Sequence, residues 1–318
     1  MGKVAFVFPG QGSQSVGMGQ ELANEYTEVN AIIKNADEKL GFNLSSLMFE
    51  GPQEELTLTY NAQPALLTTS IAILQKLTAA GITADYVAGH SLGEYSALVA
   101  ANAISFEDAV HTVHLRGKFM EEAVPAGEGT MAAVLGLDEV SLKEVTDTVT
   151  SEVAPVQLAN LNCPGQIVIS GSAEGVKVAS EKAKEKGAKR VIPLVVSGPF
   201  HSSLMKPAAE KLAATLASIN IQDTKMSVIA NVNAEEMSVA SEMREKLVQQ
   251  LYSPVRWEQS VEKMIELGVD TFIEVGPGKV LSGLIKKIDR KVTTIPVYDL
   301  ETLQKAIEYF EVEGSTNA

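Results

Sequence analysis

A serine flanked by glycines is the residue of this sequence with the clearest chemical potential. Residues 89–93 read Gly-His-Ser-Leu-Gly, so Ser91 is the centre of a G-x-S-x-G pentapeptide. The apolar residues 86–88 predict a short buried strand, and residues 92–101 predict a helix. A serine on such a turn is exposed beside free helix N–H groups, which can stabilise an oxyanion. The pentapeptide also occurs in ordinary turns, so the hypothesis that Ser91 is a nucleophile depends on this setting.

A serine nucleophile needs a base within hydrogen-bond reach, and the sequence has only 4 histidines. Of these, His201 alone lies in a Gly/Pro loop that follows a predicted strand, where catalytic groups are expected. We therefore predict that His201 is the general base for Ser91, with an ordinary loop histidine as the alternative. His111 and His114 share a helix with Glu107, but nothing nearby completes a metal site, and no metal is expected.

Arg116 is a third candidate, because it lies on the apolar face of a helix predicted from residue 105 to residue 122. No carboxylate on this helix neutralises it, since its neighbours at three and four residues' distance are Thr112, Val113, Phe119 and Met120. An unpaired buried charge is costly, and a planar guanidinium suits both oxygens of a carboxylate. We expect Arg116 to bind an anionic ligand; a structural salt bridge to a distant Asp or Glu is the alternative.

The elements that position these residues begin with a buried strand predicted over residues 3–8. The Pro-Gly-Gln-Gly loop of residues 9–12 follows, and its glycines match neither a dinucleotide fingerprint nor a phosphate loop. Because the loop comes after the C-terminal end of a strand, Gln11 is predicted to supply an N–H to an oxyanion. A plain tight turn is the alternative.

Helices and strands alternate through the rest of the chain. Helices are predicted over residues 17–40, 62–80, 206–217, 241–251, 261–267 and from after residue 278 to 288, and strands over 226–231 and 271–275. Asn61, Gln63 and Pro64, at the start of the second of these helices, are interpreted as a capping turn, with a role in lining a site as the alternative. The alternation predicts an α/β core with a parallel sheet.

A smaller unit interrupts this core. Strands at 130–135, 156–161, 166–170 and 190–196 and helices at 137–149 and 176–186 give the order β-α-β-β-α-β, which is typical of a ferredoxin-like subdomain. We predict a large domain of residues 1–126 and 199–318 and a small domain of residues 127–198. Residues 160–166 are predicted to form a hairpin loop, whose Asn160 and Asn162 are candidates to line a cleft.

Composition excludes several classes of function. The net charge of −14 argues against nucleic-acid binding, and no apolar run is long enough to span a membrane. No export signal is visible, and the single cysteine, Cys163, permits no internal disulfide, so the cytoplasm is expected. Two basic clusters, one with Lys189 and Arg190 and the other with Lys286 and Lys287, are either solvated faces or docking sites for an acidic partner.

Motifs along nearly the whole chain resemble the malonyl-CoA:acyl carrier protein transacylases of fatty acid synthesis and the related acyltransferase domains of polyketide synthases. The matching segments are FVFPGQGSQ, GHSLGEYSAL, Arg116, NCPGQIVISG, SGPFHSSLM, QLYSPVRW and FIEVGPGKVLSGLIKK. The resemblance implies an α/β-hydrolase-like core with an inserted ferredoxin-like subdomain. This is the architecture that the order of predicted elements gives independently.

The same resemblance assigns roles to residues. It implies that Ser91 is the nucleophile and His201 its base, that the backbone N–H groups of Gln11 and Leu92 form the oxyanion hole, and that Arg116 binds the free malonyl carboxylate. Gln250 would orient the histidine through its backbone carbonyl, in place of a triad aspartate. Phe200 would crowd an α-methyl group and so help to separate malonyl from methylmalonyl units.

The implied reaction is a ping-pong transfer of malonyl from malonyl-CoA to the phosphopantetheine thiol of acyl carrier protein, without a cofactor of the enzyme's own. The basic clusters would dock the carrier protein. The alternatives are an esterase or thioesterase, an inactive subunit that only docks carrier protein, a trans-acting polyketide transferase, and the malonyl-transfer subunit of a malonate decarboxylase. In a hydrolase with the usual order of serine, acid and histidine along the chain, an Asp or Glu is expected between Ser91 and His201, and none stands out in a loop there.

Overall fold

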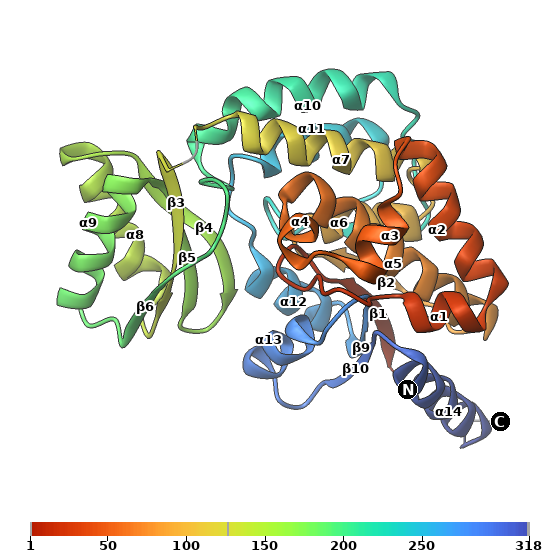
Figure 1. Ribbon diagram of the computed structural model, residues 1–318. Helices are drawn as coiled ribbons and strands as arrows, with labels where there is room; N and C mark the ends of the chain where they lie inside the picture. Colours follow the sequence, from red (N-terminus) through yellow and green to blue (C-terminus); the bar gives the residue numbers. More distant parts are fainter. Residues whose placement is uncertain (1, 126, 317–318) are drawn as a thin grey trace.

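The computed structural model describes residues 2–125 and 127–316, which form a mixed α/β fold with two separate sheets (Figure 1). The larger sheet has the order β10-β9-β1-β2-β7-β8 and is parallel except for the β7–β8 pair. Its strands are β1 (Lys3–Phe8), β2 (Tyr86–Gly89), β7 (Ser227–Ile229), β8 (Glu236–Met237), β9 (Val269–Val275) and β10 (Thr293–Val297). The predicted fold class, a parallel core with an inserted second sheet, is confirmed.

Side chains that alternate along β1 explain why helices cover both faces of this sheet. Val4, Phe6 and Phe8 pack into one cluster with helices α5, α6 and α7, and Ala5 and Val7 pack into another with α12 and α13. Strands buried on both faces are continuously apolar, as the sequence of β1 is. The bounds are α5 (Thr59–Ala79), α6 (Gly93–Ala100), α7 (Phe106–Glu122), α12 (Trp257–Glu266) and α13 (Val280–Ile288).

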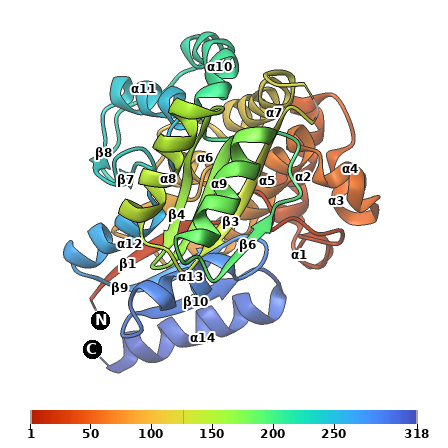
Figure 2. The same cartoon turned by 90° about the vertical axis from the view of Figure 1, so that its left-hand side faces the viewer.

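The smaller sheet is antiparallel throughout, with the order β4-β5-β3-β6. Its elements follow one another as β3 (Gly129–Leu135), α8 (Glu139–Glu152), β4 (Val156–Cys163), β5 (Gln166–Ser172), α9 (Ala173–Glu185) and β6 (Arg190–Pro193). The two helices cover one face of the sheet, as Figure 2 shows. This is the predicted β-α-β-β-α-β order; the exact domain boundaries stay a prediction, and residue 126 lies outside the described residues.

The two sheets share packing and backbone hydrogen bonds. Met131, Ala159 and Val168 of the small sheet belong to the main hydrophobic cluster of the large one. Val255, just before α12, accepts a hydrogen bond from the Leu161 N–H and donates one to the Ala159 carbonyl, each 2.8 Å long. Strand β4 is therefore attached to both parts of the molecule, which fixes its side chains relative to the turn at Ser91 that follows β2.

The remaining helices enclose the large sheet or extend from it. They are α1 (Gln20–Glu25), α2 (Thr27–Leu40), α3 (Leu44–Glu50), α4 (Gln53–Thr57), α10 (Lys206–Ser218), α11 (Ala240–Gln250) and α14 (Leu300–Thr316), with a 3-10 turn at Ser203–Met205. Within residues 2–125 and 127–316, no helix has the length and apolar character needed to cross a membrane.

Some sequence predictions about elements were wrong. The helix predicted over residues 17–40 is two helices, because Gly17 and Gly19 have left-handed backbone (φ 94° and 76°) and Tyr26 is extended. The strand predicted over 190–196 ends at Pro193, although the Leu194 N–H still donates to the Met131 carbonyl of β3 at 3.0 Å. Asn160 and Asn162 lie within strand β4 rather than in a hairpin loop, since β4 stays paired with β5 as far as Cys163.

Candidate active site

Ser91 occupies a left-handed turn between β2 and α6, with φ 51°. The glycines on either side are required by close packing. A Cβ on Gly89 would lie 1.9 Å from the carbonyl of Gly93, and a Cβ on Gly93 would lie 2.1 Å from the carbonyl oxygen of Phe8 in β1. The turn is thus sharp enough to project the Ser91 hydroxyl from the end of the sheet, as a nucleophile elbow does.

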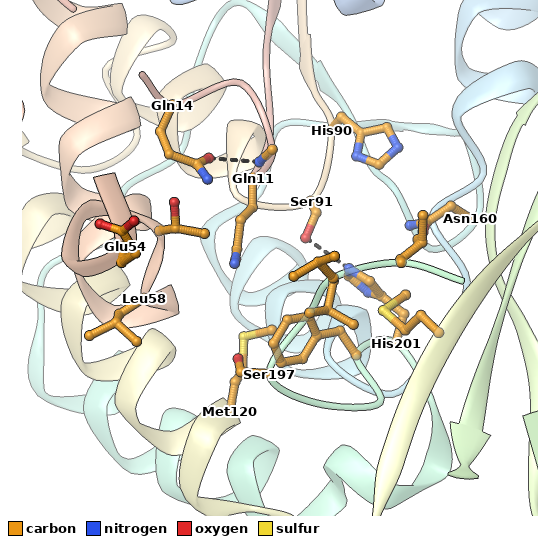
Figure 3. A pocket seen from close by; sticks show the side chains of 17 residues that line it. Gln11, Gln14, Glu54, Leu58, His90, Ser91, Met120, Asn160, Ser197 and His201 are labelled. Carbon is orange, nitrogen blue, oxygen red and sulfur yellow. Dashed lines mark hydrogen bonds between the residues drawn. The ribbon is translucent and has the colours of Figure 1, made fainter. Parts of the chain in front are cut away.

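His201 meets Ser91 from the segment that follows β6. Its Nε2 lies 2.8 Å from Ser91 Oγ (Figure 3), and its Nδ1 lies 2.8 Å from the backbone carbonyl of Gln250. A carbonyl only accepts, so Nδ1 carries the proton and Nε2 is left to accept from the serine hydroxyl. The pair predicted from sequence is brought together in the geometry that a general base requires.

Burial keeps this histidine neutral. The side chain is 4% exposed, and burial, together with the charge of Arg116, lowers the pKa of His201 to about 3. The imidazole is therefore an unprotonated acceptor across the neutral pH range. Its backbone has φ 58°, so both Ser91 and His201 hold left-handed conformations that non-glycine residues seldom adopt.

Arg116 lies beside Ser91 and is 1% exposed. Its Nη2 donates to Ser91 Oγ at 3.2 Å and to Gln250 Oε1 at 2.8 Å, and its Nη1 donates to Gln63 Oε1 at 2.7 Å. Within the described part of the chain its Nε has no hydrogen-bond partner, and no carboxylate forms an ion pair with it. The alternative of a structural salt bridge is therefore wrong for the described residues, and the charge is held by neutral amides.

Gln63 is a site residue that the sequence interpretation missed. Helix α5 begins at Thr59, so Gln63 and Pro64 lie inside it and do not form a capping turn. Pro64 lacks the N–H that would bond to the carbonyl of Tyr60. His114 Nδ1 donates to that carbonyl instead, at 2.7 Å, which satisfies it and ties α7 to α5. A proline within an apolar helix pattern was the available signal for a special contact.

Two further buried polar residues hold the elbow. The Asn231 side chain accepts from the Ser91 N–H at 2.7 Å and donates to the Gly89 carbonyl at 2.7 Å. Gln250 Nε2 donates to the Ser91 carbonyl at 2.9 Å and to Glu94 Oε2 at 2.7 Å. Asn231 and Glu94 were not predicted as site residues, because the contacts that define them join segments more than 130 residues apart.

The two predicted oxyanion donors are placed at the ends of adjacent strands. Gln11 follows β1 and Leu92 follows Ser91 at the start of α6. Among the hydrogen bonds of the described residues, none is donated by the backbone N–H of either one. The side chain of Gln11 is occupied separately, since its Nε2 donates to Thr59 Oγ1 at 3.2 Å. Both N–H groups thus remain available to a ligand oxygen.

A cavity of about 300 Å³ opens in front of Ser91 and His201 (Figure 3). Both sheets contribute to its walls: Gln11, Leu58, His90, Met120 and Phe200 come from the large part of the fold, and Met131 and Asn160 come from the small sheet. Asn162 is not among the lining residues; its Oδ1 lies 2.9 Å from His90 Nε2. Arg116 is not a lining residue either, although its guanidinium contacts Ser91 Oγ.

The small sheet also steadies the histidine. Gln157 of β4 donates from Nε2 to the His201 carbonyl at 3.3 Å and accepts from the Ser203 N–H at 2.8 Å. A side chain of β4 therefore spans the segment that carries the base. The site depends on both sheets: Ser91 follows β2 of the large sheet, and His201 lies between β6 of the small sheet and the 3-10 turn at Ser203–Met205.

A serine on a strained elbow, a neutral histidine within hydrogen-bond distance and free N–H groups beside them define the class of enzymes that transfer acyl groups through a serine. The chain belongs to the acyl transferase domain family, whose model matches residues 5–311. It is 63% identical over 314 residues to the malonyl CoA-acyl carrier protein transacylase of Bacillus subtilis (strain 168), covering 99% of each chain.

Solved structures agree with this assignment. The malonyl CoA-acyl carrier protein transacylase of Clostridium perfringens superposes with a TM-score of 0.95 at 44% identity, covering 99% of this chain and 100% of that one. A malonyl-transacylase in complex with a type II PKS acyl-carrier protein superposes with a TM-score of 0.94 at 44% identity, covering 96% of this chain and 99% of that one. The family expected from the sequence motifs is confirmed.

Proposed function

We propose that the protein transfers a malonyl group from malonyl-CoA to the phosphopantetheine thiol of acyl carrier protein through a malonyl-Ser91 intermediate. The observation that carries this proposal is Arg116: a buried cation, held only by neutral groups, that donates to the oxygen of the reacting serine. An acyl group with its own carboxylate supplies the direct ionic partner that Arg116 lacks. The relatives named as malonyl transacylases, and the solved complex with an acyl-carrier protein, support the same substrates.

In the first half-reaction the substrate carboxylate pairs with Arg116 while the thioester carbonyl approaches Ser91. His201 Nε2 accepts the hydroxyl proton as Oγ attacks the carbonyl carbon, and the N–H groups of Gln11 and Leu92 stabilise the oxyanion. The carbon–sulfur bond then breaks, and the CoA sulfur leaves with the proton from His201. The products are malonyl-Ser91 and free CoA.

In the second half-reaction the carrier-protein thiol replaces CoA and the same groups act in reverse. His201 accepts the thiol proton and sulfur attacks the ester carbon; the bond between that carbon and Ser91 Oγ then breaks, and Oγ takes the proton back from His201. A thiolate is a good leaving group, so the base needs only the Gln250 carbonyl to orient it, without a buried carboxylate. Neither half needs a cofactor of the enzyme's own.

Docking of the carrier protein is proposed at the predicted basic residues. Lys189, Arg190, Lys286 and Lys287 are all exposed. Leu135 of β3 pairs with Gln166 on one side and Arg190 on the other, and Lys287 Nζ lies 3.3 Å from Gln166 Oε1. The clusters are therefore neighbours at one end of the strands of the small sheet, where β3 ends and β5 and β6 begin, and we call them jointly the basic edge. An acidic carrier is attracted to it.

Phe200 is proposed to restrict the acyl group. Its ring is 6% exposed and forms part of the cavity wall directly before His201. An α-methyl substituent would have to displace this ring, although a single methyl group discriminates by only about 1–3 kcal/mol. Asn160 also lines the cavity and is proposed to contact the substrate. We further propose that the protein acts in the cytoplasm, where its single cysteine stays reduced.

Intact-mass measurement after mixing with malonyl-CoA tests the intermediate. The expected result is an adduct of one malonyl group on the wild type, removed by added acyl carrier protein. Ser91→Ala should carry no adduct. The matched control Ser260→Ala, in α12 away from the cavity, should carry the adduct as the wild type does. An adduct that survives Ser91→Ala would disprove the serine intermediate. An adduct that water clears as fast as carrier protein would favour a thioesterase.

A further inference from the structure

Glu94 is a buried carboxyl group that the steps above do not use. It lies in the first turn of α6, three residues after Ser91, and its side chain is fully buried. Oε2 accepts from Gln250 Nε2 at 2.7 Å and from the Asn231 N–H at 3.3 Å. Oε1 has no hydrogen-bond partner within the described residues. A buried carboxylate needs a compensating charge nearby, because desolvation is costly.

The compensating charge is Arg116, and the Gln250 amide connects the two. Its Oε1 accepts from Arg116 Nη2 at 2.8 Å, and its Nε2 donates to Glu94 Oε2. One side chain therefore fixes the cation and the carboxyl group at either end of the same planar amide. Neither charged group has a direct ionic partner among the residues that the structure describes.

The other ionisable groups around Glu94 do not replace this pairing. Lys246 on α11 contributes an attraction, but its Nζ lies 2.6 Å from Glu242 and is neutralised there. Tyr95, the next residue, stays neutral because burial raises its pKa far above the usual range. Burial raises the pKa of Glu94 to about 7, against the lowering effects of Gln250, Asn231, Arg116 and Lys246. Its charge is therefore adjustable near neutral pH.

We propose that Glu94 is the counter-charge of Arg116 in the empty site and gives up that charge, by taking a proton from solvent, when a substrate carboxylate binds Arg116. It is a positioning and specificity-determining residue, because it acts through Gln250 and does not touch the reacting atoms. This inference rests on the proposed function, since it requires an acyl group that carries a carboxylate.

The protonation of Glu94 on binding of a substrate carboxylate determines which acyl groups the site prefers. With Glu94 ionised, Arg116 is balanced, so a neutral acetyl group meets a site without net charge. A malonyl carboxylate brings a second negative charge near Glu94, and the proton taken up removes the repulsion. Removal of the Glu94 charge should therefore favour malonyl and disfavour acetyl, since the unbalanced Arg116 then needs an anion.

Glu94→Gln tests this with little change of shape. The amide oxygen can accept from Gln250 and Asn231 in place of Oε2, and the amide nitrogen takes the position of the unpartnered Oε1. At about pH 8 the ratio of kcat/KM for malonyl-CoA to that for acetyl-CoA should rise on the order of tenfold. Glu274→Gln is the matched control: Glu274 is also buried with a raised pKa, but it caps α13 through the N–H groups of Leu281 and Ser282. It should leave the ratio unchanged.

The pH dependence gives a second readout on the same variants. Above about pH 7, wild-type KM for malonyl-CoA should rise with pH, because binding then has to neutralise an ionised Glu94. KM for acetyl-CoA should not follow this trend, and Glu94→Gln should abolish it for malonyl-CoA. An unchanged ratio together with an unchanged pH trend in Glu94→Gln would overturn the inference.

A measurement of proton uptake by the wild type tests the inference without any variant, so it still applies if Glu94→Gln does not fold. Acyl transfer from thioester to serine releases and consumes no net proton, since the thiol leaves protonated. At about pH 7.5 in weak buffer, an indicator dye should report uptake of a fraction of a proton per malonyl-enzyme formed, and none for acetyl. An adduct without uptake would sink the role of Glu94 but leave the proposed function intact. Absence of the adduct would contradict the proposed function itself.

Discussion

Arg116 shows how single residues set the chemistry of this site. Gln63 and Gln250 bind its guanidinium through amide oxygens, so the cation is fixed in place without being neutralised by direct contact. A direct carboxylate partner would compete with the ligand, whereas amide oxygens leave the charge for an incoming anion. Binding of a substrate carboxylate then gains a charge-assisted pair inside a low-dielectric environment.

Arg116→Ala is expected to lower kcat/KM for malonyl-CoA by roughly a hundredfold, because a buried charge-assisted pair is lost. Transfer from acetyl-CoA should hold or rise, since the acyl site then has no cation that needs an anion, and Glu94 without Arg116 is protonated more readily. Steady-state kinetics with both thioesters measure the difference. Equal losses for both substrates would mean that Arg116 is structural.

The residues that we propose do the chemistry could be predicted from the sequence, but the residues that hold them in place could not. Ser91, His201 and Arg116 stand out because their local sequence is unusual for a serine, a histidine and an arginine. Asn231 and Glu94 do not, since an asparagine after a strand and a glutamate in a helix's first turn are common. Their roles depend on contacts with Ser91 and Gln250 that exist only after folding.

At the scale of elements, the elbow depends on how closely α6 approaches β1. Gly93→Ala would place a Cβ 2.1 Å from the Phe8 carbonyl oxygen, so the helix and strand would have to separate. We expect a loss of about 3 kcal/mol or more in the free energy of unfolding, and a large loss of acylation.

Gly283→Ala in α13 is the matched comparison, because its Cβ would meet nothing within 4 Å. It should be neutral or stabilising by up to about 1 kcal/mol, as alanine favours a helix. Urea denaturation followed by circular dichroism measures both variants. A Gly93→Ala protein as stable as the wild type would contradict the packing explanation.

Most elements could be predicted because hydrophobic periodicity reports burial directly. The wrong predictions concern segments whose local structure is determined by residues distant in the sequence. Helix α5 extends back past Pro64, and His114 of α7 satisfies the Tyr60 carbonyl that the proline leaves without its helical donor. Strand β4 continues through Asn160 because β5 and Val255 pair with it.

The whole molecule combines an acidic surface with a local basic edge. The net charge is −14, yet Lys189, Arg190, Lys286 and Lys287 meet where the small sheet adjoins α13. The sequence predicted two separate clusters; only the fold makes them neighbours, because Leu135 pairs with both Gln166 and Arg190. An acidic partner is therefore repelled elsewhere and attracted at this edge.

Charge reversal tests the basic edge. Replacing Lys189 and Arg190, or Lys286 and Lys287, by Glu should raise KM for acyl carrier protein by roughly tenfold and leave KM for malonyl-CoA unchanged. Replacing Lys34 and Lys39, which are exposed on α2, by Glu is the control, because it changes the net charge equally at a place away from the basic edge. If this control raises KM as much as the edge variants, net charge rather than a docking site is responsible.

The hydrogen bond from Arg116 to Ser91 has a consequence for the timing of the reaction. In the empty enzyme the Ser91 hydroxyl donates to His201 Nε2 and accepts from Arg116 Nη2. The positive guanidinium therefore withdraws electron density from the oxygen that has to attack the thioester. A substrate carboxylate that recruits Arg116 relieves this demand before the thioester carbonyl is attacked. On the proposed function, we expect recognition of the far end of the acyl group to raise reactivity at the near end, so that a thioester without a carboxylate meets a less reactive serine.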